Sequence, residues 1–114
     1  MTRNEFIAAY IEAALFADTP DEAPSGSELS QSSKLKLELR AGEFYDANES
    51  AIFMYANSSH GSNSGHDLWY TQNGHGCGYW EHDTFSSARA LDTAAREMGQ
   101  IDIYLGDDGE LHAD

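Results

Sequence analysis

Basic residues are scarce in this chain of 114 residues, which has six lysines and arginines against twenty aspartates and glutamates. Cysteine is rarer still. Cys77 is the only one, and a single thiol excludes an internal disulfide and is typical of a reducing cytoplasm. No apolar run approaches about 18 residues, so the sequence predicts no membrane-spanning helix, and the N-terminus MTRNEF lacks the pattern of a signal peptide. The length predicts one domain, residues 1–114, with a single hydrophobic core.

The negative charge is large and uneven along the chain. The formal net charge is −14, and residues 41–114 carry thirteen acids against Arg89 and Arg96 alone, which is a net of −11. Such a surface repels nucleic acid and anionic membranes, and it attracts basic protein sites over a long range. Solubility requires a net charge of only about 2–8 in a small domain, so the excess indicates either a strongly solvated surface or a binding surface.

The first third of the chain predicts a helix followed by a loop. Thr2 and Glu5 have the spacing of a capping box, in which each side chain accepts a hydrogen bond from the backbone amide of the other residue. The apolar residues that follow recur on one helical face, which predicts a helix over 4–17. The next stretch is polar, acidic and rich in serine, and it contains two prolines. It predicts a mobile acidic loop over 18–33.

Residues 34–57 carry two competing patterns. Residues 34–39 alternate like a half-buried strand, whereas apolar residues from Leu37 to Tyr55 recur at helical spacing. The longer pattern and the strong helix formers favour one helix over 34–57, beginning as early as Ser30. Gly42 is a weak point of that helix, because glycine costs about 1 kcal/mol relative to alanine there.

The stretch over 65–82, GHDLWYTQNGHGCGYWEH, is rich in aromatic residues and glycines. Asn-Gly between two aromatic-rich runs is the strongest short signal for a hairpin, because the tight turn needs positive φ. The stretch therefore predicts a β-hairpin over 66–82, with a strand over 67–72, a turn over 73–76 and a return strand over 77–81.

The C-terminal third predicts a helix and a second hairpin. Asp83 or Thr84 can cap a helix over 84–98, and Gly99 is suited to end it. Alternation from Ile101 to Leu105, followed by the turn sequence Gly-Asp-Asp-Gly, predicts a strand and hairpin over 101–112. The expected fold is an α+β domain. A small antiparallel sheet of three to four strands, formed by the two hairpins, would pack against about three helices.

Two motifs resemble a family of small, mostly uncharacterised phage and prophage proteins. GHDLWYTQNGHGCGYWE and the later IDIYLGDDGEL are similar to the core of that family, which is roughly G-H-D-[FL]-W-x-T-x-N-G-H-G-x-G-[FY]-W-[DE], then a helix and Y-x-G-D-D-G. Residues 10–15, and Phe44 with Asn48, are weaker matches to two of its helices. At residues 82–85 this chain differs from the family, which usually has a longer glycine-rich loop at that place. The resemblance implies a phage-type origin and this fold, and it implies no reaction.

Histidines and the cysteine invite two chemical interpretations. Zinc needs four nitrogen or sulfur ligands, often in closely spaced pairs, and only His75 and Cys77 form such a pair while His60, His66 and His82 are scattered. A catalytic site would use Cys77 as nucleophile with His66 or His75 as its base. We favour structural roles for these residues. The sequence therefore predicts no catalytic residue, no metal and no cofactor.

Carboxylates outside the expected core form the candidate binding surface. Glu43 with Asp46, and Asp46 with Glu49, are like-charge pairs three residues apart that repel each other by roughly a few tenths of a kcal/mol. Like-charge clustering that costs folding energy indicates a partner. The candidate partner-binding residues are Glu43, Asp46, Glu49, Glu81, Asp83, Asp102, Asp107, Asp108 and Glu110.

These observations lead to one principal hypothesis and two alternatives. The principal hypothesis is a non-enzymatic, phage-encoded inhibitor, a monomer or homodimer in the cytoplasm of the host cell. Its carboxylates would stand in for DNA phosphates in the basic nucleic-acid-binding site of a host defence complex, either CRISPR or restriction. Direct nucleic-acid binding is disfavoured, because the aromatic residues that could stack on bases lack a positively charged groove. The alternatives are a phage accessory or structural protein that binds through aromatic surface, and a metal-dependent enzyme that uses the His and Cys residues.

Overall fold

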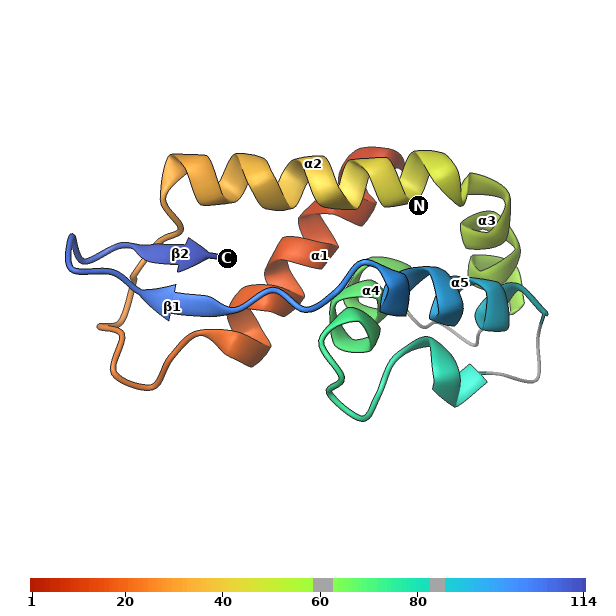
Figure 1. Ribbon diagram of the computed structural model, residues 1–114. Helices are drawn as coiled ribbons and strands as arrows, with labels where there is room; N and C mark the ends of the chain where they lie inside the picture. Colours follow the sequence, from red (N-terminus) through yellow and green to blue (C-terminus); the bar gives the residue numbers. More distant parts are fainter. Residues whose placement is uncertain (59–62, 83–85) are drawn as a thin grey trace.

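The computed structural model describes residues 1–58, 63–82 and 86–114, and helices dominate it (Figure 1). The elements in chain order are α1 (Arg3–Asp18), α2 (Gln31–Ala47), α3 (Glu49–Ser58), α4 (Ser64–Gln72), the 3₁₀ helix η1 (Tyr79–His82), α5 (Ser86–Glu97), β1 (Ile103–Leu105) and β2 (Leu111–Ala113). Helix α1 crosses α2 and packs against α4, while α5 packs against α3, α4 and η1. The hairpin lies beside the start of α2, at one end of a molecule that measures 43 × 24 × 23 Å. No helix within the described ranges is both long and apolar enough to cross a membrane.

The sheet is smaller than the sequence indicates. Within the described residues it has two antiparallel strands, in which Ile103 pairs with Ala113 and Leu105 pairs with Leu111. An isolated parallel bridge also joins Leu29 to Leu111. The predicted α+β fold, with a sheet of three to four strands from two hairpins, is therefore wrong. The protein is a helical domain with one short C-terminal hairpin.

The hairpin predicted over 66–82 is wrong, because its first strand is helix α4 and its second strand is largely η1. Asn63 caps α4 by accepting hydrogen bonds from two backbone amides of the first turn, at 3.0 and 3.2 Å. Gly65, Leu68, Trp69 and Gln72 recur at helical spacing, and all four are buried. Three glycines between Gln72 and η1 have positive φ and turn the chain back. The Asn-Gly signal marks the end of a helix here.

The continuous helix predicted over 34–57 is two helices, α2 and α3, which meet at Asn48 (Figure 1). Asn48 leaves the helical conformation, with φ of −127° and ψ of 22°. Its side-chain Nδ2 donates a hydrogen bond to the Phe44 carbonyl oxygen at 2.9 Å, so the side chain competes with the backbone for a helical acceptor. Beyond this point α3 buries Ile52 and Tyr55 in the core. The predicted weak point, Gly42, lies inside α2 and does not break it.

Local signals at two helix ends are confirmed. The Glu5 amide donates to Thr2 Oγ1 at 3.1 Å, and the Thr2 amide donates to Glu5 Oε1 at 2.7 Å, which completes the capping box. Gly99 follows α5 in the left-handed conformation, with φ of +78°. The two candidate caps of α5, Asp83 and Thr84, lie outside the described residues.

Aromatic residues form the centre of the core. The rings of Tyr10 and Trp69 meet edge to face with their centroids 5.3 Å apart, and those of Tyr55 and Tyr79 do so at 5.1 Å. All four side chains are fully buried. Such ring pairs stabilise a fold by about 0.5–1.5 kcal/mol in addition to the free energy that comes from burying their apolar surface. Trp69 and Tyr79 therefore join α4 and η1 to the rest of the domain and are not available as a binding platform.

Helices α1 and α4 approach each other closely at Gly65. A Cβ atom built on Gly65 would stand 2.5 Å from the carbonyl oxygen of Phe6 and 2.8 Å from the Cβ of Ala9. Only glycine permits this distance between the two helices. The close approach brings Trp69 of α4 against Tyr10 of α1.

Candidate functional site

The turn between β1 and β2 and the loop from α1 to α2 lie at the same end of the molecule (Figure 1), and both segments carry exposed acidic residues. The Leu111 amide donates to the Glu28 carbonyl oxygen at 2.9 Å, and the Ser30 amide donates to the Leu111 carbonyl oxygen at 2.8 Å. The loop predicted over 18–33 is therefore shorter than expected, and its second half is held against β2. We call the following set the acidic end: Asp21, Glu22, Glu28, Asp107, Asp108 and Glu110.

The charge of the acidic end is largely uncompensated. Five of its six carboxylates have no ion-pair partner among the described residues, and the sixth, Asp108, lies 3.1 Å from Nε2 of His112. Asp108 Oδ1 also accepts a hydrogen bond from the Glu110 backbone amide at 2.9 Å. That backbone hydrogen bond first, and His112 second, lower the pKa of Asp108 below its ordinary value. Asp108 therefore stays ionised and holds the turn in place.

Four of the nine predicted partner-binding residues lie on this side of the molecule. Asp107, Asp108 and Glu110 belong to the acidic end, and Asp102 lies at the base of the hairpin. The backbone of Asp102 pairs there with that of Asp114, with N···O distances of 3.0 and 2.9 Å. Sequence reasoning missed the three loop members of the acidic end, because the pairing of the loop with β2 is a long-range contact. The acidic composition of the loop was the available signal.

The other predicted carboxylates lie elsewhere, on α2, α3 and η1: Glu43, Asp46, Glu49 and Glu81. Arg3 Nε lies 2.9 Å from Asp46 Oδ1, which neutralises this carboxylate and lowers its pKa. Asp83 lies outside the described residues. Because exposed charges more than about 8 Å apart are largely screened in physiological salt, this group and the acidic end act as separate surfaces.

The histidines are held by separate carboxylates. Nε2 of His66 lies 2.7 Å from Oε1 of Glu12, and Nε2 of His75 lies 2.8 Å from Oδ2 of Asp18. In the part of the chain that the structure describes, no three His, Cys, Asp or Glu side chains are placed to hold a metal ion. His60 lies outside the described residues.

Cys77 has the environment of an unreactive thiol. Burial first, and the nearby carboxylates of Glu81 and Asp67 second, raise the pKa of this thiol above its ordinary value. The thiolate is the nucleophilic form of cysteine, and a raised pKa leaves less of it at neutral pH. The electrostatics of the site therefore oppose the catalytic interpretation of Cys77.

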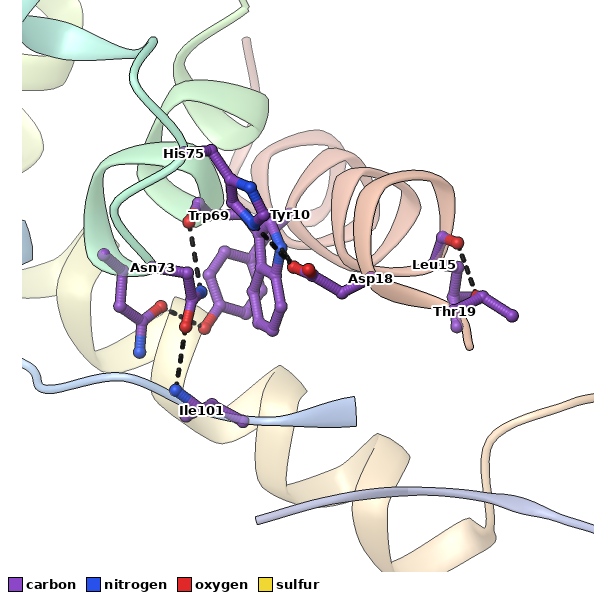
Figure 2. A network of polar contacts seen from close by, with 9 residues as sticks. Tyr10, Leu15, Asp18, Thr19, Trp69, Asn73, His75 and Ile101 are labelled. Atoms are coloured by element: carbon purple, nitrogen blue, oxygen red, sulfur yellow. Dashed lines mark hydrogen bonds and ion pairs between the residues drawn. The ribbon is translucent and has the colours of Figure 1, made fainter. Parts of the chain in front are cut away.

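A polar network joins the end of α1 to the end of α4, as Figure 2 shows. Asp18 Oδ2 accepts a hydrogen bond from Trp69 Nε1 at 2.6 Å, in addition to its contact with His75. Asn73 donates from Nδ2 to the Trp69 carbonyl oxygen at 3.1 Å, and its Oδ1 accepts from the Ile101 amide at 2.8 Å. A polar cleft of about 140 Å³ lies against these side chains. The network fixes the segment that leads into β1, and so it positions the hairpin of the acidic end.

No family model, no curated protein and no solved structure matches the chain.

Proposed function

We propose that this protein is a non-enzymatic inhibitor whose acidic end occupies the polyanion-binding site of a basic protein. The observation that carries the proposal is the presence of six exposed carboxylates on two segments whose backbones pair with each other, and five of the six lack an ion-pair partner among the described residues. Each carboxylate can accept two parallel hydrogen bonds from an arginine, as a phosphate does. A site built to bind a row of phosphates would bind such a surface.

The way the acidic end is held supports this proposal. Backbone hydrogen bonds join the loop to β2, and the Asp108 carboxylate orders the turn, so these backbones are positioned before any partner arrives. A pre-positioned surface loses less conformational entropy on binding. Concentrated charge of one sign also steers a basic partner and raises the association rate constant, and salt screens this effect.

We propose a host defence complex, either CRISPR or restriction, as the partner, with the host-cell cytoplasm as the place of action. The resemblance to phage and prophage proteins favours this class of partner. A net charge of −14 opposes direct binding of this chain to nucleic acid. The inhibitor and the nucleic acid would therefore compete for one site on the partner.

Affinity capture followed by binding measurements tests the proposal. The protein is immobilised, host lysate is applied at about 50 mM and about 500 mM salt, and proteins retained only at low salt are identified. Binding of a retained protein is then compared for two double variants that each remove two negative charges. One carries Asp107→Asn with Glu110→Gln in the acidic end, and the matched control carries Glu43→Gln on α2 with Glu49→Gln at the start of α3.

We expect the acidic-end variant to bind about tenfold more weakly, chiefly through a slower association rate constant, and the control to stay within about twofold. A nucleic-acid ligand of the retained protein should displace the inhibitor. Equal effects of the two variants, affinity unchanged by salt, or simultaneous binding of nucleic acid and inhibitor would each contradict the proposal.

A second candidate function is favoured by exposed aromatic side chains away from the acidic end. Phe53 on α3 is 66% exposed and Trp80 on η1 is 44% exposed, and both elements pack against α5. A phage accessory or structural protein could bind its partner through these rings. In that case Phe53→Ser would weaken binding, whereas high salt and the acidic-end variant would leave it unchanged.

A further inference from the structure

A groove of about 870 Å³ runs between α1 and the first turns of α2. Ile7 and Ile11 of α1 line it, and Leu35 and Leu39 of α2 line its other side. The two leucines are 54% and 63% exposed and lie one helical turn apart, so they form an apolar ridge beside the groove. Figure 1 shows α1 crossing α2 in this region.

The charges around this groove balance each other, unlike those of the rest of the chain. Lys34 and Glu38 both line it, one helical turn apart on α2, and neither has an ion-pair partner within the described ranges. Arg3, also on the rim, is paired with Asp46. Two copies of a chain with a net charge of −14 would repel each other less through this locally neutral surface than through their acidic ends.

We propose that two copies of this chain pair about a two-fold axis through this groove. Each copy carries both a ridge, Leu35 with Leu39, and a groove floored by Ile7 and Ile11, so the same surface is complementary to itself. The ridge of each copy enters the groove of the other. This inference goes beyond the proposed function, because the acidic end takes no part in the pairing.

Charge complementarity selects a second copy as the occupant. A two-fold axis perpendicular to α2 makes the paired α2 helices antiparallel, and an axis that passes midway between residues 34 and 38 brings Lys34 of each copy opposite Glu38 of the other. The two unpaired charges thereby gain partners, twice in each dimer. The dimer presents two acidic ends, one from each copy.

Sedimentation equilibrium of the full chain tests the pairing. We expect a reversible monomer–dimer equilibrium between about 1 µM and about 1 mM protein, and a monomer throughout that range for Leu39→Glu. Leu39 is exposed, so this variant should keep the circular dichroism spectrum and the unfolding midpoint of the dilute wild-type protein. A wild-type chain that stays monomeric at about 1 mM would overturn the proposal and leave the groove to another protein.

Charge reversal tests the two-fold arrangement itself. Lys34→Glu and Glu38→Lys should each weaken self-association about tenfold, because each replaces two attractive contacts with two repulsive ones. An equimolar mixture of the two variants should restore dimerisation as a heterodimer. Lys36→Glu makes the same change in charge on the same helix but outside the groove. This variant should dimerise like the wild-type chain, apart from the small loss caused by its higher net negative charge. Self-association of Lys34→Glu that is as strong as that of wild type, or a mixture of the two variants that stays monomeric, would overturn the arrangement.

Discussion

The close approach of α1 and α4 at Gly65 makes a quantitative prediction for Gly65→Ala. The added Cβ would stand 2.5 Å from the Phe6 carbonyl oxygen, 2.8 Å from the Ala9 Cβ and 3.1 Å from the Tyr10 amide nitrogen. Two of these atoms are main chain and the third is a Cβ, so no side-chain rotation relieves the contact. The two helices must separate by roughly 1 Å, which loosens the packing of Tyr10 against Trp69.

The expected cost follows from two opposing effects. Overpacking of a core costs about 1–3 kcal/mol, and a contact against rigid main chain belongs at the upper end of that range. Alanine recovers about 1 kcal/mol of helix propensity relative to glycine. Gly65→Ala should therefore lower the free energy of unfolding by about 2 kcal/mol.

Gly42→Ala is the matched control, because it makes the same substitution inside another helix. There the new Cβ would meet the guanidinium group of Arg3, which is the flexible end of a half-exposed side chain. Arg3 can move away at the expense of its exposed ion pair with Asp46, and such pairs contribute little to stability. Gly42→Ala should leave the protein as stable as wild type or slightly more stable.

Urea denaturation of the three proteins, followed by circular dichroism at one protein concentration, measures both effects. We expect a lower midpoint for Gly65→Ala at an unchanged slope, and an equal or higher midpoint for Gly42→Ala. A Gly65→Ala protein at least as stable as Gly42→Ala would refute the packing of α1 on α4 described above.

Three further predictions concern hydrogen bonds. Tyr10→Phe should lower the free energy of unfolding by about 1–2 kcal/mol, because the buried Oε1 of Gln72 loses the hydroxyl that donates to it at 2.6 Å; an unchanged urea midpoint would count against this bond. Asp18→Asn should lower it by a similar amount and should shift the fluorescence of Trp69, whose indole nitrogen loses a charged acceptor. Asp108→Asn should destabilise the protein at pH 7, and the difference should fade as the pH falls below about 4. The pKa of Asp108 is lowered in the folded state, so its stabilising effect is present above the unfolded-state pKa and is lost as the carboxyl becomes protonated. A difference that is constant from pH 7 to pH 3 would contradict that explanation.

The sequence predicts features whose contacts are local. Thr2 and Glu5 lie within one turn of each other, and so the cap they form can be recognised without knowledge of the rest of the fold. Gly99 ends α5 through its own φ, and the C-terminal strands pair across a short turn. Each of these features requires only residues that are neighbours in the chain.

The region around α4 was mispredicted because local signals conflict there. The aromatic residues and the Asn-Gly pair indicate a hairpin, whereas Asn63 as a cap and the burial of every third or fourth residue indicate a helix. Contact with α1 at Gly65 favours the helix, and the sequence does not show that contact. The break at Asn48 is a similar case, in which one side-chain hydrogen bond divides a region with continuous helical periodicity.

The candidate site was only partly predictable for the same reason. Asp107 and Glu110 are evident from the turn sequence, whereas Glu28 joins them through backbone pairing with a strand more than eighty residues away. The sequence gives the amount of charge but not its distribution over the surface. The ion pair that neutralises Asp46 is likewise a contact across 43 positions of the chain.

Ser30 belongs to two structures at once. Its amide is bonded to the carbonyl oxygen of Leu111, and its hydroxyl oxygen accepts from the Ser33 amide at 3.2 Å as the cap of α2. A disturbance that pulls the loop away from the hairpin therefore also unravels the beginning of α2, and the two segments should exchange their amide hydrogens as one cooperative unit. Lys34 lies in that first turn and Leu35 follows it directly, so a force on the loop at one end of the molecule would also disturb the surface where a second copy docks.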